Sequence, residues 1–241
     1  EILKRFKVEP AMTCGHSFGE LSALHSAGRF DEQTLFSLAV ARGKYMSEAG
    51  GTGDKGGMLA VKALMNEIDD LIKTSGLDVV LANRNSPDQG ILSGPTDAIM
   101  QMKSICKEKK IRATLLPVAA AFHSRLVQSA AEPFKAKIDS VDFLDSRIPV
   151  YSNTTAMPYP DREKDTKEIL GSHLMNPVNF IEEIQNMYQN GISMFVEVGP
   201  RTVLTGLIKS ILADQPVFAM AMDASSGRRS GLTDIAKMLC L

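Results

Sequence analysis

The feature that most constrains the fold of this chain is a serine held between two glycines where a predicted strand meets a predicted helix. Residues 15–19 are GHSFG, the apolar residues 10–14 before them predict a short buried strand, and residues 18–27 have helical apolar spacing. This arrangement is typical of a nucleophile elbow, because the tight turn leaves no room for side chains two positions before and after the serine. It predicts an α/β protein with Ser17 at a helix N-terminus.

Such a turn suits a nucleophile, since backbone N–H groups and the helix dipole at this position can stabilise an oxyanion. The alternative is a tight structural turn in which Ser17 has no chemical role. The strand before the serine and the helix after it favour the nucleophile.

Residues 57–120 show a different order of elements from the rest of the chain. Strands are predicted at 58–63, 79–83, 90–94 and 111–118, and helices at 65–76 and 96–110. The order βαββαβ is typical of a ferredoxin-like unit. A glycine-rich stretch precedes it and an alanine run follows it. We therefore predict a small subdomain, residues 57–120, inserted into a larger one formed by residues 1–56 and 121–241.

The flanking segments predict the sheet of the larger subdomain. Helices are predicted at 32–48, 124–139, 165–174, 180–191 and 202–212 and from about 231, and strands at 148–153, 193–199 and 217–222. Short, nearly continuous apolar strands separated by helices favour a parallel sheet covered on both faces. Asp31 is the expected N-cap of the helix at 32–48.

Composition argues against several classes of function. A net charge of -1 provides no strong field for nucleic acid or an anionic membrane. No apolar run approaches the roughly 20 residues that span a bilayer, and the first ten residues lack the apolar core of a signal peptide. The three cysteines are far apart and form no CxxC pair, which argues against disulfides and zinc and fits a reducing cytoplasm.

A serine nucleophile needs a base near neutral pH, and four histidines are available. His16 adjoins Ser17 on the turn, so its side chain is expected to point away and to pack or form a hydrogen bond. His25 is too far along the helix. His123, just after the small subdomain, and His173 stay as alternatives, and spacing favours His123.

Arg42 lies on the apolar stripe of the helix at 32–48, together with Leu35, Leu38 and Met46. A cation on a core-facing stripe needs a partner, and no acidic residue lies three or four positions away. Either Arg42 forms a structural ion pair with a distant carboxylate, or it binds a carboxylate on the substrate.

Taken together, these segments resemble the malonyl-CoA:acyl-carrier-protein transacylase family, which includes acyltransferase domains of type I polyketide and polyunsaturated fatty acid synthases. GHSFGELSA resembles the family's nucleophile motif, ARGKYM its carboxylate-binding arginine segment, and AAFHS its catalytic histidine motif. HLMNPVNF and FVEVGPRTVLTGLIK match two further segments in the same order. The resemblance implies a hydrolase-like parallel-sheet subdomain with an inserted ferredoxin-like one.

The resemblance implies a cytoplasmic transferase that binds no cofactor or metal of its own. Ser17 would attack the thioester of malonyl-CoA with His123 as base. The phosphopantetheine thiol of an acyl carrier protein would then take the acyl group. A backbone carbonyl near HLMNP, the position of His173, would orient the imidazole, with Asn176 as a further supporting residue. Neighbouring synthase domains such as a ketosynthase are the other expected partners, and neither nucleic acid nor membrane is expected.

The substrate-binding residues that the resemblance implies are Arg42, Phe18, Phe122 and His16. Arg42 favours a dicarboxylic acyl group, and the N–H of Phe18 would bind the oxyanion. Phe122 matches the bulky residue of malonyl-selective domains, which would crowd an α-methyl group. Two positions before Phe122, many such domains carry a histidine, whereas this chain carries Ala120.

The family's GQGxQ segment, whose glutamine helps form the oxyanion hole, is absent from this sequence. We therefore expect a piece of a multidomain synthase that lacks the N-terminal part of the family domain. Two other functions stay open: an acyl hydrolase of the same fold that releases acyl groups to water, and an inactive docking module of a megasynthase.

Overall fold

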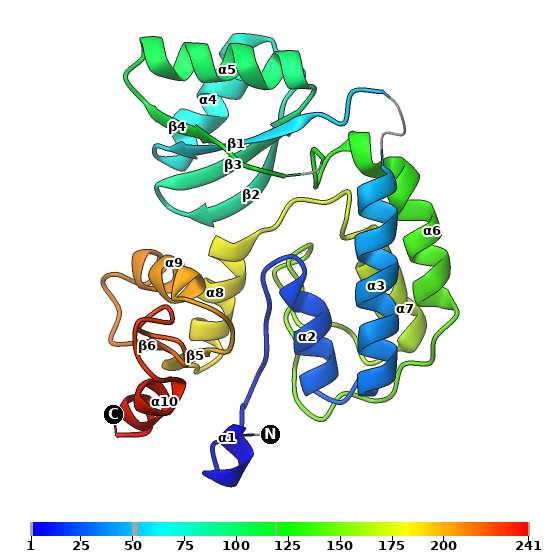
Figure 1. Cartoon of the computed structure of the whole chain (residues 1–241), viewed down its shortest axis with the longest axis vertical. Coiled ribbons are helices and arrows are strands. Elements are labelled where there is room, and N and C mark those ends of the chain that lie inside the picture. The colour runs from blue at the N-terminus through cyan, green and yellow to red at the C-terminus, as the bar shows by residue number, and fades with distance from the viewer. Residues whose placement is uncertain (1, 50–52, 119, 241) are drawn as a thin grey trace. The chain divides into compact units, whose positions relative to one another are not determined.

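The computed structural model describes residues 2–49, 53–118 and 120–240 (Figure 1). The chain divides into two compact units, one ending at Glu183 and the other beginning at Ile184. The helices are α1 (Ile2–Arg5), α2 (Gly19–Ser26), α3 (Glu32–Glu48), α4 (Met65–Ser75), α5 (Thr96–Glu108), α6 (Gln128–Asp139), α7 (Glu163–Ser172), α8 (Phe180–Gln189), α9 (Val203–Ile211) and α10 (Gly231–Leu239), with a 3₁₀ turn η1 at Arg125–Val127. The strands are β1 (Gly57–Lys62), β2 (Val80–Ser86), β3 (Gln89–Gly94), β4 (Arg112–Leu115), β5 (Met194–Glu197) and β6 (Phe218–Ala221).

Helices α2, α3, α6 and α7 lie side by side in the first unit and enclose one hydrophobic core (Figure 1). Leu21, Leu24, Leu38 and Phe134 are among its fully buried side chains. The predicted N-cap of α3 is confirmed, since an Asp31 carboxylate oxygen accepts a hydrogen bond from the Thr34 N–H at 2.8 Å. These helices hold the nucleophile turn, at the start of α2, close to α3.

Strands β1 to β4 form an antiparallel sheet in the order β2-β3-β1-β4. Figure 1 shows α4 and α5 on one face of this sheet. A second core between sheet and helices buries Leu59, Ile68, Leu92, Ile99 and Met102. Every strand and helix predicted between residues 58 and 118 is present, with ends shifted by a few residues.

The predicted buried strands at 10–14 and 148–153 are wrong as regular strands. In the described ranges these two segments form isolated bridges only: Thr13 pairs with Val150 in parallel, with the Thr13 N–H donating to Pro149 O at 3.0 Å, and Tyr151 pairs with Pro158 in an antiparallel bridge. Pro10 and Pro149 have no N–H to extend the ladder, and the turn at Gly15 ends the segment. Pro10 is also exposed. Within the described part of the first unit, parallel pairing is limited to isolated bridges, so the predicted parallel sheet is not formed there.

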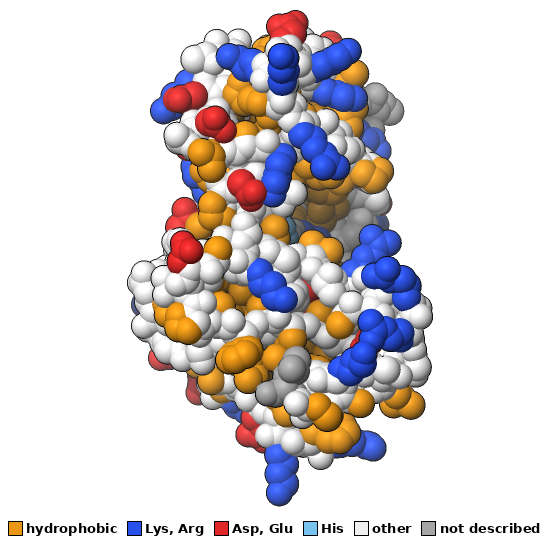
Figure 2. Space-filling view, turned by 90° about the vertical axis from the view of Figure 1, so that its left-hand side faces the viewer, with side chains coloured by type: hydrophobic (Ala, Val, Ile, Leu, Met, Phe, Trp, Pro, Cys, Tyr) orange, Lys and Arg blue, Asp and Glu red, His pale blue; other side chains and the backbone are white. Residues whose placement is uncertain are grey.

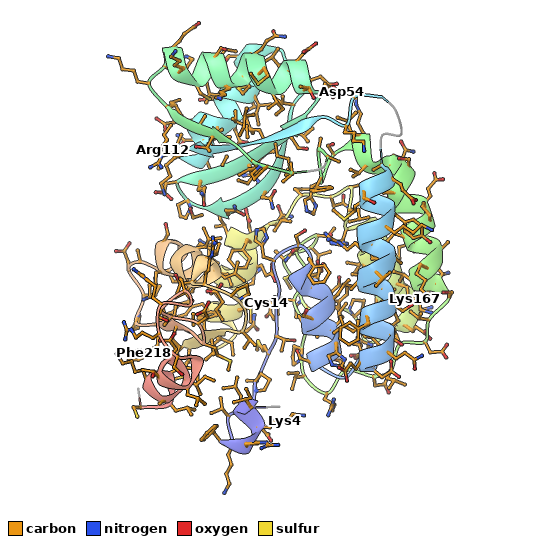
Figure 3. All side chains as sticks on the ribbon, viewed as in Figure 1. Lys4, Cys14, Asp54, Arg112, Lys167 and Phe218 are labelled. Carbon is orange, nitrogen blue, oxygen red and sulfur yellow. The ribbon has the colours of Figure 1, made fainter. Side chains whose placement is uncertain are left out.

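The second unit contains the parallel pair β5 and β6, in which Met194 lies opposite Phe218. The Glu197 carboxylate, at the end of β5, accepts hydrogen bonds from the backbone N–H groups of Leu204 at 3.0 Å and Thr205 at 2.8 Å. These bonds provide acceptors for N–H groups in the first turn of α9. Phe218, labelled on β6 in Figure 3, is 65% exposed. This unit therefore shows the predicted parallel pairing across a helix.

On the face drawn in Figure 2, lysine and arginine side chains are scattered among hydrophobic ones. Across residues 2–49, 53–118 and 120–240, no helix is long and apolar enough to cross a membrane. The same ranges contain no group of three or more His, Cys, Asp or Glu side chains that could hold a metal ion.

Candidate active site

The turn that carries Ser17 is strained and depends on one of its two glycines. Ser17 has φ +51°, in the left-handed region that non-glycine residues seldom adopt. A Cβ on Gly15 would lie 2.0 Å from the backbone carbonyl carbon of Gly19, so this position requires glycine. A Cβ on Gly19 would meet nothing within 4 Å. The expectation that both glycines are needed for space therefore holds only for Gly15.

The structure brings Ser17, His123 and Arg42 together from three separate segments. Ser17 Oγ lies 3.0 Å from His123 Nε2 and also 3.0 Å from Arg42 Nη2. Ser17 starts the turn into α2, and Arg42 extends from α3. His123 follows the chain's return from β4. A hydroxyl between a neutral imidazole and a guanidinium can pass its proton to the imidazole while the cation stabilises the negative charge that develops.

His123 is fixed in position and tautomer by backbone groups. The backbone N–H of His123 donates to Leu174 O at 3.1 Å. Its ring Nδ1 lies 3.1 Å from His173 O and 2.9 Å from Asn176 O. Because two carbonyls can only accept, Nδ1 carries the proton and Nε2 presents its lone pair to Ser17. Burial lowers the pKa of His123 to about 4, although the Asn176 carbonyl opposes this shift. The imidazole is therefore neutral near pH 7.

His173 supplies a carbonyl to this arrangement rather than its ring. Its side chain is buried, and its own Nδ1 lies 3.3 Å from Leu170 O. Of the two candidate bases, His123 is therefore the one whose ring lies beside Ser17. Asn176 is held in turn by its side-chain amide, which donates to Ser172 O at 2.9 Å. His25 lies outside this group, with Nδ1 3.0 Å from Phe30 O.

Arg42 is buried on α3 with only 6% of its surface exposed. Burial lowers the pKa of its guanidinium to about 10, so it stays charged at neutral pH. In the described ranges no carboxylate lies within salt-bridge distance of it, so the structural ion pair considered above is not observed. Its Nε is buried and has no hydrogen-bond partner among the residues that the structure describes. A buried cation whose nearest polar contact is a hydroxyl is suited to an anionic ligand.

The other predicted substrate-binding residues surround this group to different degrees. Phe18 is 46% exposed, its ring centroid lies 5.6 Å from Arg42 Cζ, and its N–H has no acceptor in the described part of the chain. Phe122 is half-buried next to His123 and packs against the Ala49 and Met58 clusters. His16 forms a hydrogen bond with a distant residue, its Nε2 lying 2.7 Å from Asn85 Oδ1.

Sequence reasoning missed the buried polar residues beneath the turn. Asn153 accepts the Ser17 N–H at 2.6 Å, and Glu20 and Glu183 are fully buried beside it. Burial raises the pKa of Glu20 to about 7, while a hydrogen bond from Tyr159 opposes the shift. The available signal was that Asn153 ends the predicted strand at 148–153, where functional side chains of α/β proteins gather.

The fold is that of an α/β protein, and comparison with known proteins places the chain in the acyltransferase class. The sequence profile of the family described as the acyl transferase domain matches residues 1–228. The chain therefore belongs to the acyl transferase domain family.

Individual relatives agree with this assignment. The chain is 35% identical over 218 residues to the malonyl CoA-acyl carrier protein transacylase of Bacillus subtilis strain 168, covering 87% of this chain and 68% of that protein. It is 32% identical over 238 residues to the spectinabilin polyketide synthase system protein NorB of Streptomyces orinoci, covering 98% of this chain but only 11% of NorB. The solved structure of a type II polyketide synthase acyl-carrier protein in complex with its malonyl-transacylase matches with a TM-score of 0.86 at 30% identity, over 98% of this chain and 76% of that one.

Proposed function

We propose that this chain transfers a malonyl group from coenzyme A to the phosphopantetheine thiol of an acyl carrier protein, in polyketide or fatty acid synthesis. The observation that carries the proposal is the buried Arg42, which has no carboxylate within salt-bridge distance in the described ranges and whose Nη2 lies 3.0 Å from Ser17 Oγ. An acyl group on Ser17 that ends in a carboxylate would supply the missing anion. The relatives named as malonyl transacylases, one of them in complex with a carrier protein, support the same substrate and partner.

The first half-reaction forms an ester on Ser17. Ser17 Oγ attacks the thioester carbonyl of malonyl-CoA while His123 Nε2 takes the hydroxyl proton. The Phe18 N–H, at the start of α2, faces the oxyanion of the tetrahedral intermediate. The C–S bond then breaks, and the proton on His123 passes to the departing CoA thiolate.

The second half-reaction reverses these steps with a new thiol. The carrier protein's phosphopantetheine thiol gives its proton to His123 and attacks the ester carbonyl of malonyl-Ser17. The C–O bond to Ser17 breaks, and His123 returns the proton to Ser17 Oγ. His123 thus acts as base and then acid in both halves, and the carbonyls of His173 and Asn176 accept from its Nδ1–H in both protonation states.

Two further assignments belong to this proposal. Phe122, adjacent to His123, crowds the α-carbon of the acyl group and favours malonyl over methylmalonyl.

We also assign residues 57–120 to a ferredoxin-like small subdomain, and residues 1–56 and 121–241 to a hydrolase-like large one. The separate antiparallel sheet and core of β1–β4, α4 and α5 support this division. Three free cysteines are consistent with a cytoplasmic location.

The test is transfer to a carrier protein that bears phosphopantetheine. The full chain is incubated with malonyl-CoA and the carrier protein, and both proteins are weighed by intact mass spectrometry. The proposal predicts a malonylated carrier protein, and no product with the Ser17→Ala variant. Release of free malonate without carrier loading would instead favour the hydrolase, and no acyl-enzyme at all would favour the docking module.

A further inference from the structure

Asn153 connects both sides of the nucleophile turn. Its Oδ1 accepts the N–H of Ser17 at 2.6 Å, and its Nδ2 donates to Gly15 O, also at 2.6 Å. Gly15 precedes the turn that the Gly19 N–H closes by donating to His16 O at 3.0 Å, and Ser17 lies within that turn. The Asn153 side chain therefore connects the entry of the turn to Ser17, whose φ is +51°. Asn153 is 1% exposed, so these contacts are shielded from bulk solvent.

Glu183, in the first turn of α8, fixes which way the Asn153 amide points. Asn153 Nδ2 donates its second hydrogen to Glu183 Oε2 at 2.6 Å. Gly15 O and the Glu183 oxygen accept at the nitrogen end of the amide, so its oxygen end faces the Ser17 N–H. Glu183 is fully buried, and burial raises the pKa of its carboxyl group well above the usual value. A third bond, from the Asn153 N–H to Glu20 Oε1 at 3.2 Å, anchors the backbone of Asn153.

We propose that Asn153 and Glu183 are positioning residues for acyl transfer. Asn153 holds the strained turn so that Ser17 Oγ faces His123 Nε2, and Glu183 acts through Asn153 by orienting its amide. The inference rests on the proposed function only in taking Ser17 as the nucleophile. It does not depend on which acyl group is transferred.

The experiment measures the reactivity of Ser17 without its acyl substrate. A fluorophosphonate phosphonylates activated serines, and intact mass gives the rate constant for single labelling of the full chain. Thermal unfolding in parallel gives the folded fraction, so the rate is expressed per folded molecule. The variants are Asn153→Ala, Glu183→Leu and Glu183→Gln. The control is Arg29→Met, which removes a buried side chain beyond the far end of α2 whose hydrogen bonds, within the described ranges, all go to backbone carbonyls.

We expect labelling of Asn153→Ala and of Glu183→Leu to slow by at least about tenfold per folded molecule, because a displaced nucleophile loses its alignment with the base. Glu183→Gln keeps an oxygen that accepts from Asn153, so its rate should stay within about threefold of the original. Arg29→Met should lower Tm and leave the rate unchanged. A rate at the original level for Asn153→Ala would overturn the proposal.

The two Glu183 variants keep the proposal testable if Asn153→Ala does not fold. Equal slowing of Glu183→Gln and Glu183→Leu would overturn the role of Glu183 as a hydrogen-bond acceptor. The control reaction is loading with malonyl-CoA. A chain that is phosphonylated normally but never malonylated would refute the proposed function, and the positioning of Ser17 would still be measured.

Discussion

Replacing Arg42 by glutamine should separate dicarboxylic from simple acyl groups. The Arg42 guanidinium is buried, stays charged and has no carboxylate partner in the described ranges. Its contact with a malonyl carboxylate would be a charge-assisted pair worth about 3 kcal/mol, or roughly 150-fold in kcat/KM. Acetyl transfer loses only the contact from Arg42 Nη2 to Ser17 Oγ, worth about 1 kcal/mol or fivefold.

The assay is the initial rate of Ser17 loading from malonyl-CoA and from acetyl-CoA, each measured by intact mass for the original chain and for Arg42→Gln. Arg42→Lys is the matched variant, because it keeps the charge but loses the two-pronged geometry, and its malonyl rate should lie between the other two. A loss of the same size with both acyl groups would refute the reasoning, since Arg42 would then act on Ser17 and not on the substrate.

Three other changes have defined outcomes. Gly15→Ala should prevent native folding, because its Cβ would lie 2.0 Å from Gly19 backbone, whereas Gly19→Ala should be tolerated and unfold at an equal or higher temperature; circular dichroism melts compare the two. Because the pKa of His123 is lowered to about 4, the imidazole is neutral above that value, so stopped-flow loading rates should stay flat from pH 8 to about pH 5 and fall below it; a midpoint near 6.5 would contradict the burial argument. Phe122→Ser should raise methylmalonyl loading relative to malonyl by about tenfold or more in a competition assay, and an unchanged ratio would remove Phe122 from substrate selection.

Local patterns made part of this fold predictable. The glycine–serine–glycine turn, the N-cap at Asp31 and the βαββαβ order depend on neighbouring residues, so the sequence displays them directly. The predicted strands at 10–14 and 148–153 were wrong because of single residues within these segments. Apolar character suggested strands, but proline at 10 and 149 removes N–H donors that a ladder needs.

The site was predictable where a residue type was chemically conspicuous. Arg42 stood out as a cation on an apolar stripe, and His123 as a histidine after an alanine run. The choice between His123 and His173 needed the structure, because Ser17 and His123 are 106 positions apart in the sequence. Asn153 and Glu183 gave a weaker signal. Asn153 only ended a predicted strand and Glu183 lay in a predicted helix, and their importance arises from burial and from contacts between distant segments.

The most direct test of the central claim is the mass of the chain after incubation with malonyl-CoA, methylmalonyl-CoA and acetyl-CoA in separate reactions. The account predicts one malonyl group attached to Ser17, confirmed by peptide mapping, with weaker methylmalonyl and acetyl loading and none in Ser17→Ala. Malonyl attached to another residue, or acetyl loaded in preference to malonyl, would contradict the assignment of Ser17, His123 and Arg42 as one site.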